Sequence, residues 1–99
     1  MRVRYIPRAQ HDIDDIFADT ADAYLDHAQR VETAIRLAAE LLRREPNIGV
    51  ATGHDNVRRW PMTDYGYAIF YRIDWDQEFI DVLRVIANRR VRNVNRIPR

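Results

Sequence analysis

Arginine is the residue type whose number and spacing suggest chemistry in this sequence. The chain has 99 residues, and all 16 of its basic residues are arginines. A guanidinium group presents a planar set of donors that suits carboxylates and phosphates, and burial does not neutralise it. The absence of lysine excludes a lysine general base and a Schiff base. We therefore expect a surface that binds acidic groups.

The arginines dominate the second half of the chain. Residues 1–50 hold 7 arginines and 9 acidic residues, whereas residues 51–99 hold 9 arginines and 6 acidic residues. Between Val82 and Arg99 there are 6 arginines and no acidic residue. A GC-rich genome explains the use of arginine in place of lysine equally well. The local excess of positive charge nevertheless attracts acidic proteins and phosphates.

The other reactive residue types form no catalytic or metal-binding cluster. His11, His27 and His54 are scattered, and the chain has no cysteine. We therefore predict no metal site, no disulfide and no cofactor. No apolar run approaches the length of a membrane span, and the residues after Met1 alternate like a strand instead of forming a signal peptide. We expect one domain over residues 1–99, cytoplasmic and with no membrane contact.

The first half of the chain predicts a strand and two helices. Residues 2–6 alternate in polarity and stop at Pro7, as a strand would. A helical period begins at Ala9, and a second one covers residues 25–45. The first helix is expected to bury Ile13, Ile16, Phe17 and Thr20 and to expose His11, Asp12, Asp15 and Asp19. The second is expected to bury Ala28, Val31, Ile35, Ala38 and Leu42.

The second half of the chain predicts a meander of three strands. Three β-rich runs cover residues 57–62, 67–74 and 79–85, and the two breaks between them are short enough for hairpin loops. Residues 47–56 are expected to form a crossing with Gly49 and Gly53 at turns. The polar segment 86–99 is expected to be a basic C-terminal tail.

These elements together predict an α+β fold. An N-terminal strand, a two-helix hairpin and an antiparallel three-strand meander form one twisted sheet, with both helices on one face. The other face, or an edge of the sheet, remains available for a partner.

This ordered set of segments resembles the RelE/ParE superfamily, the toxins of bacterial type II toxin–antitoxin pairs. Four segments carry the resemblance: AQHDIDDIFADT, AAELLRREPNIG, VRRWPMTDYGYAIFYRID and DVLRVIANRR. Together they cover nearly the whole chain. The resemblance implies the same α+β fold and a cognate antitoxin as partner.

The resemblance is closer to the ParE branch than to the RelE branch. RelE-like ribonucleases commonly have an arginine two residues after a glycine in the middle meander strand, and here that position is Ala68. They also have a tyrosine or histidine near the C-terminus, whereas residues 86–99 contain neither. Arginine is a poor proton donor or acceptor at neutral pH. ParE-like patterns are present as Val57-Arg58-Arg59, Phe70-Tyr71-Arg72 and Arg84-Val85 followed by Arg89-Arg90.

The resemblance and the charge pattern give one set of candidate residues for binding a target or an antitoxin. They are Arg58, Arg59, Arg72, Arg84, Arg89, Arg90 and Arg92. Arg58 and Arg59 are neighbours on one strand, so their side chains are expected on opposite faces of the sheet. Arg72 and Arg84 lie in otherwise apolar strands, so a structural role for each requires a carboxylate: Asp74, Asp81 or an acid of the first helix.

The function implied by the ParE resemblance is non-enzymatic inhibition of DNA gyrase, neutralised by a ParD-like antitoxin with an acidic or amphipathic C-terminal segment. A hetero-oligomer with that antitoxin is the expected assembly. One alternative is a RelE-like, ribosome-dependent mRNA endonuclease. Another is an inactive family member that acts only as antitoxin partner and co-repressor.

Overall fold

A strand, two helices and a run of strands follow one another in the computed structural model, which describes residues 1–89. The strand β1 (Arg2–Tyr5) leads into the helices α1 (Pro7–Ala21) and α2 (Leu25–Arg44). A short 3-10 turn η1 (Pro46–Ile48) and the strand β2 (Val50–Ala51) follow. The last strands are β3 (Val57–Met62), β4 (Tyr67–Asp74) and β5 (Phe79–Ala87).

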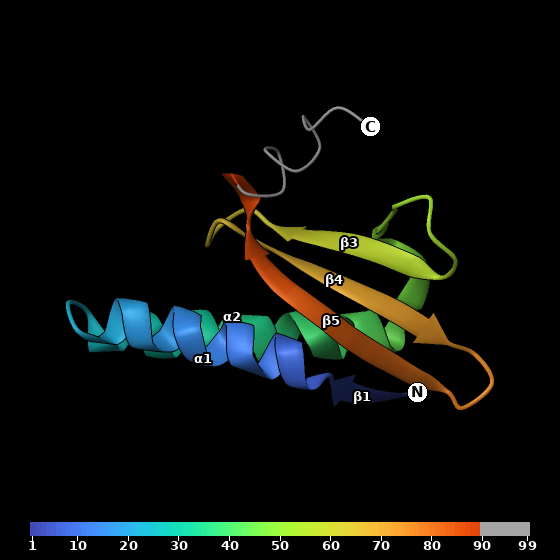
Figure 1. Ribbon diagram of the computed structural model, residues 1–99, viewed down its shortest axis with the longest axis horizontal. Helices are drawn as coiled ribbons and strands as arrows, with labels where there is room; N and C mark the ends of the chain where they lie inside the picture. The colour runs from blue at the N-terminus through green and yellow to red at the C-terminus, as the bar shows by residue number, and fades with distance from the viewer. Residues whose placement is uncertain (90–99) are drawn as a thin grey trace.

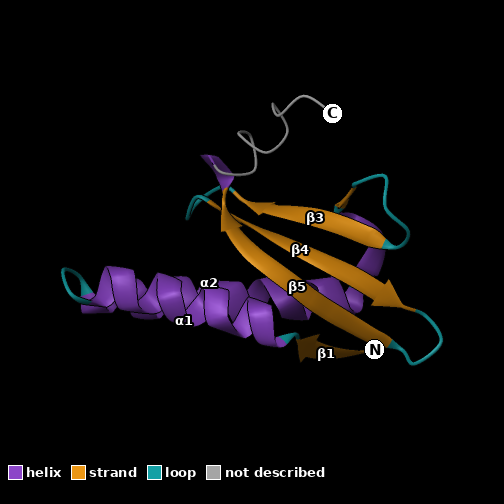
Figure 2. Ribbon diagram, in the orientation of Figure 1, coloured by secondary structure: helices purple, strands orange, loops and turns teal. Residues whose placement is uncertain are grey.

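The described strands form one mixed sheet in the order β1-β5-β4-β3-β2. β1 runs parallel to β5, whereas β5, β4, β3 and β2 pair antiparallel. The two helices lie side by side against one side of this sheet (Figures 1 and 2). The predicted α+β arrangement is therefore confirmed. No helix within residues 1–89 is long and apolar enough to cross a membrane.

The core lies between the helices and one face of the sheet. Its fully buried larger side chains are Ile13, Val31, Ile35, Leu42, Ile69, Tyr71, Ile80 and Val82. In α2 the buried positions recur at three- and four-residue steps, as the sequence period predicts. One position differs, because Ala39 is buried and Ala38 only partly buried.

Alternation along the strands separates two faces of the sheet. Ile69, Tyr71 and Ile73 of β4 are buried toward the helices, so Phe70 and Arg72 between them point to the other side. We call that side the open face. Its members on neighbouring strands follow from the pairing: Arg59 lies opposite Phe70, and Asp81 lies opposite both Arg72 and Arg4.

The start of α1 and the burial of one residue on its predicted exposed face differ from the sequence prediction. The helix begins at Pro7, because proline is favoured in the first turn, where its missing N–H needs no partner. Asp12, expected in solvent, is buried at 7% exposure. The reason is an ion pair with Arg84 of β5 that sequence spacing within α1 cannot reveal.

The C-terminal strand is longer than predicted and the crossing is more ordered. β5 continues through Ile86 and Ala87, so the segment expected to be a tail from residue 86 begins as strand. The crossing contains β2, which pairs Val50 with Arg59 and was not predicted. Gly53 has a positive φ of 90° and lies in a turn as expected, whereas Gly49 is buried and has a φ of −72°. Residues 90–99, with Arg90 and Arg92, lie outside the described residues.

Candidate functional site

The open face gathers arginines around one aromatic ring. The pairing of three adjacent strands places Arg59 of β3 and Arg84 of β5 on either side of Phe70 of β4. Arg72 follows two residues along β4 and therefore lies on the same face. Phe70 is partly buried, so its ring is available at the surface. This arrangement offers an apolar contact with cations around it.

Arg59 and Arg72 are the arginines beside Phe70 with unfilled donors, and Arg2, on the same face at the start of β1, also makes no ion pair within residues 1–89. Within residues 1–89, Arg59 makes no ion pair. The Arg72 side chain is 50% exposed, and its contact is an Nη2–Oδ2 distance of 4.0 Å to Asp81. At that distance the attraction is coulombic and no hydrogen bond forms. Both guanidinium groups can therefore donate to a carboxylate or phosphate without first breaking an internal hydrogen bond.

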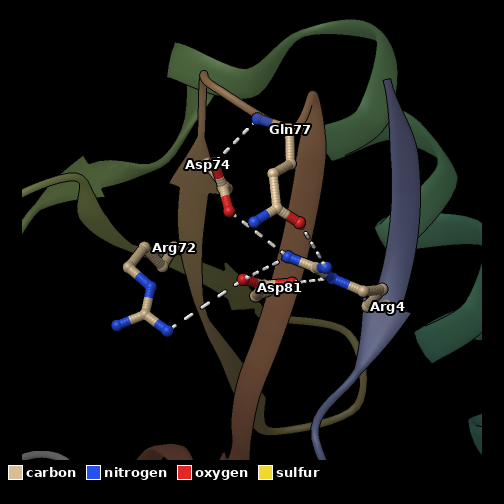
Figure 3. Close-up of polar contacts among 5 residues, drawn as sticks. All are labelled: Arg4, Arg72, Asp74, Gln77 and Asp81. Carbon is tan, nitrogen blue, oxygen red and sulfur yellow. Dashed lines mark hydrogen bonds and ion pairs between the residues drawn. The ribbon is translucent and has the colours of Figure 1, made fainter.

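Asp81 is instead held by Arg4, as Figure 3 shows. Arg4 Nε donates to Asp81 Oδ1 at 2.6 Å and Nη2 donates to Oδ2 at 3.1 Å. The same guanidinium donates to Gln77 at 3.2 Å and to Asp74 at 3.4 Å, and it stacks 3.8 Å from the centre of the Phe79 ring. The hydrogen bond to Asp81 is the main reason that the pKa of Arg4 is raised.

Arg84 is tied to α1 and is not free for a partner. A bulge leaves Leu83 without a cross-strand partner, because Tyr71 pairs with Val82 and Phe70 with Arg84. Arg84 Nε donates to Asp12 Oδ2 at 2.7 Å, and Nη2 donates to Oδ1 at 3.2 Å. The sequence left Asp74, Asp81 and the acids of the first helix open as structural partners of Arg84, and the structure shows an acid of the first helix.

The Asp12 carboxylate also closes an edge of the sheet. β1 pairs with β5 only as far as Val82, and the N–H of Val85 beyond that point donates to Asp12 Oδ2 at 3.0 Å. Burial raises the pKa of Asp12, but the hydrogen bonds from Arg84 and Val85 oppose it, and the net pKa is lowered. Asp12 therefore carries a charge under physiological conditions.

Arg58 lies on the helix side, away from Arg59, as the alternation predicted. Its Nη1 donates to the carbonyl of Gly49 at 2.7 Å. Close by, the Tyr71 hydroxyl donates to the Pro46 carbonyl at 2.6 Å and accepts from the Gly49 N–H at 3.0 Å. These bonds fasten the crossing between α2 and β3, so the structure gives Arg58 a structural contact.

Over the described strands the open face carries no tyrosine or histidine, and its carboxylates Asp74 and Asp81 both accept hydrogen bonds from Arg4. Ala68 is fully buried and pairs with Pro61 on one side and Ile86 on the other, so this end of the face is apolar. Tyr67 and Tyr71 point to the helix side, where burial raises the pKa of each phenol. The described residues also hold no group of three or more histidine or acidic side chains suited to a metal ion.

The structure thus divides the candidate arginines. Arg59 and Arg72 share the open face, Arg84 and Arg58 make internal contacts, and Arg89 is exposed at the end of the described chain. The N–H of Asn88 donates to the Gly66 carbonyl at 2.8 Å, which places this end beside the β3–β4 turn.

Sequence reasoning missed Arg4 and Phe70 as members of the face. The sequence predicts that each lies in a strand, but it assigns neither of them a neighbour on another strand. Only the parallel pairing of β1 with β5 brings Arg4 to Asp81, and no local pattern specifies that pairing.

Comparison with known proteins identifies relatives of this chain. A family model described as the ParE toxin of the type II toxin–antitoxin system parDE matches residues 3–92. A chain in the chromosomal ParDE system of P. aeruginosa has a TM-score of 0.75 and 17% identity, and the match covers 88% of this chain and 95% of that one. No curated protein matches the sequence.

Two RelBE structures are also similar in fold. A chain of the intact RelBE toxin–antitoxin complex of E. coli has a TM-score of 0.68 and 13% identity, with 86% of this chain and 93% of that one covered. A chain of the RelBE2 complex of Mycobacterium tuberculosis has a TM-score of 0.67 and 22% identity, with 87% and 95% covered. At these identities the likeness concerns the fold.

Proposed function

The chain belongs to the ParE family of toxins of type II toxin–antitoxin systems, and from that premise we propose that it inhibits DNA gyrase and is neutralised by a cognate antitoxin. The observation that supports inhibition by binding is the open face. It presents Arg59 and Arg72 beside Phe70 and carries no tyrosine or histidine over the described strands. Such a face can bind an acidic group, whereas its carboxylates are paired with Arg4 and it has no tyrosine or histidine to transfer a proton in phosphodiester cleavage.

The antitoxin segment that this face suits is acidic with an apolar residue. Two guanidinium groups would receive carboxylates through charge-assisted hydrogen bonds, and the Phe70 ring would pack against the apolar side chain. Arg89 extends the positive surface past the end of β5, and the candidates Arg90 and Arg92 follow it in sequence. A hetero-oligomer with this antitoxin is the proposed assembly.

The test is a gyrase supercoiling reaction with increasing amounts of the purified protein. Lost supercoiling and accumulated cleaved DNA near stoichiometric protein would support the proposal. The control is the charge reversal Arg30→Glu, on the exposed part of α2 away from the open face, which should inhibit like the wild type.

A folded protein that leaves gyrase unaffected in large excess would overturn the gyrase assignment. The fold shared with RelBE chains makes the ribosome the next target, tested by mRNA cleavage in a translating extract. Cleavage there would favour the endonuclease alternative. Inactivity in both assays, with no growth arrest on expression, would favour a protein that only binds its antitoxin.

A further inference from the structure

Asp81 lies between two arginines that occupy equivalent positions. It pairs directly with Arg4 of β1 on one side and with Arg72 of β4 on the other. Side chains at such cross-strand positions are close enough to form an ion pair. Yet the carboxylate makes two hydrogen bonds to Arg4 and only a 4.0 Å contact to Arg72 (Figure 3). The two arginines therefore compete for one carboxylate, and Arg4 holds it.

Arg4 holds the carboxylate because it is fixed on several sides. Its guanidinium stacks on Phe79 and donates to Gln77 and Asp74 as well as to Asp81. Gln77 is itself positioned in the β4–β5 turn, where its N–H donates to Asp74 Oδ1 at 3.0 Å. The Asp81 side chain is 5% exposed, so it requires a cationic partner.

We infer that Arg4 is a positioning residue that keeps Arg72 available for an acidic partner by neutralising Asp81. Without Arg4, the buried Asp81 carboxylate would draw in the Arg72 guanidinium from the opposite cross-strand position. Arg72 would then be bonded within the protein, and the open face would lose one of the two accessible cations beside Phe70. This role rests on the proposed function for its biological meaning, but the arrangement itself can be tested without any partner.

The first experiment measures how fast phenylglyoxal modifies Arg72, followed by peptide mass mapping. A guanidinium bonded to a carboxylate resists this reagent, because the pair stabilises the protonated form. In Arg4→Gln we expect Arg72 to react about tenfold more slowly than in the wild type, the worth of one charge-assisted hydrogen bond. Arg59, which has no part in the competition, serves as the internal control and should react at an unchanged rate.

The double variant R4Q/D81N separates the inference from a general loss of structure. Without the Asp81 carboxylate, Arg72 has no acceptor at this position, so the rate at which phenylglyoxal modifies it should return to the wild-type value. An unchanged or faster rate at Arg72 in folded R4Q would overturn the inference. If R4Q does not fold, Arg4→Lys keeps the charge but loses the two-pronged contact, and it should slow the Arg72 reaction partially. No slowing in folded R4K would then overturn the inference.

The second experiment measures binding of a short glutamate- and leucine-rich peptide. Affinity should fall about tenfold in Arg72→Gln and in R4Q, and recover in R4Q/D81N, since one charged contact is lost and regained. If labelling follows expectation but Arg72→Gln leaves peptide affinity unchanged, the positioning role of Arg4 is supported and the proposed partner contact of Arg72 is contradicted. The two failures are thus distinguishable.

Discussion

At the scale of single residues, the binding that we propose for the open face depends on which arginines are already bonded. Arg4 and Arg84 each make two hydrogen bonds to one carboxylate, whereas Arg72 is half exposed and only 4.0 Å from its nearest acid. A guanidinium that is already paired must break those bonds before it can bind a partner. Exposure and pairing together, rather than the number of arginines, are therefore the reason that we propose Arg59 and Arg72 as the contact residues.

Charge reversal at these two positions should separate binding from folding. We expect Arg59→Glu and Arg72→Glu each to weaken antitoxin binding about tenfold or more, because a favourable charged contact becomes a repulsive one. Thermal stability should change little, since neither side chain is bound tightly within residues 1–89. Titration calorimetry and thermal melts measure the two effects. Equal affinity for Arg72→Glu and the control Arg30→Glu would contradict the assignment.

The Asp12–Arg84 pair should make stability depend on pH in one direction. The pKa of Asp12 is lowered on folding, so between its folded value and the ordinary value of about 3.9 the unfolded chain binds the proton more readily. The contribution of this carboxylate is therefore complete above about pH 4 and is lost as pH falls through the folded pKa. Replacing Asp12 with a neutral residue removes the negative charge of this carboxylate at every pH.

We expect Asp12→Asn to lower the free energy of unfolding by about 2 kcal/mol at pH 7, because Arg84 and the N–H of Val85 lose a charged acceptor. The difference from the wild type should shrink as the pH falls below about 4. Urea denaturation between pH 3 and pH 7 measures it. Asp14→Asn, on an exposed position of α1, is the control. A difference that stays constant over this range would contradict the pKa assignment.

At the scale of secondary-structure elements, the crossing between α2 and β3 is held by the buried Tyr71 hydroxyl and by the Arg58 side chain. Tyr71 of β4 bonds both Pro46 and Gly49, and Arg58 of β3 bonds the Gly49 carbonyl. A Cβ added at Gly49 would lie 2.5 Å from the Tyr71 hydroxyl. Glycine is thus required here by close approach, and these bonds position β2 and its neighbour β3, which contains Arg59.

Two substitutions at this contact should each lower the free energy of unfolding, and their effects should not be additive. Tyr71→Phe leaves two backbone groups unpaired and should cost about 2 kcal/mol. Gly49→Ala should cost about 1–3 kcal/mol through overpacking. In the double variant the clashing hydroxyl is absent, so the loss should be smaller than the sum of the two. Urea denaturation measures all three, with Val50→Ala on the exposed β2 as a near-neutral control. If the two losses add fully, the cost of Gly49→Ala does not come from contact with the Tyr71 hydroxyl.

The helices and strands were largely predictable from the sequence, whereas the side-chain contacts between them were only partly predictable. Periodicity placed β3 and β4 at their observed bounds, because alternation and turn residues are local signals. β2 is two residues long and leaves no such signal. Asp12 was placed in solvent because its neighbours on α1 are acidic, whereas its partners Arg84 and Val85 come from the far end of the chain. Arg4 was overlooked as a contact of Asp81 for the same reason.

At the scale of the whole molecule, charge is separated along the chain and in space. Between Ala9 and Gln29 the sequence has six acidic residues and no arginine, and this segment forms α1 and the start of α2. The distal end of that helical hairpin projects away from the strands (Figure 1). The open-face arginines Arg59 and Arg72 lie on the sheet, and Arg89 follows the C-terminal end of β5. The small net charge of +1 is therefore the sum of an acidic part, the helical hairpin, and a basic part, the sheet and the end of β5.

This separation should orient an acidic partner before contact. Long-range attraction between the basic part and an acidic antitoxin raises the association rate, and salt screens it over about 10 Å at 0.1 M. We expect the association rate constant to fall steeply with added salt, while the dissociation rate constant changes less. Reversing the charge of Arg89 and Arg90 together should lower the association rate and flatten its salt dependence, because it removes the cations that follow β5.

Stopped-flow measurements at several salt concentrations test this, with the double reversal of Arg43 and Arg44 on α2 as a control of equal charge. That control changes the net charge of the protein by the same amount but acts at the C-terminal end of α2. If position matters, only the Arg89 and Arg90 reversal flattens the salt dependence and also weakens neutralisation or toxicity in cells. An Arg89 and Arg90 variant that stays fully toxic and fully neutralised would contradict the role of the basic end. Equal effects of the two double reversals would assign the steering to net charge alone.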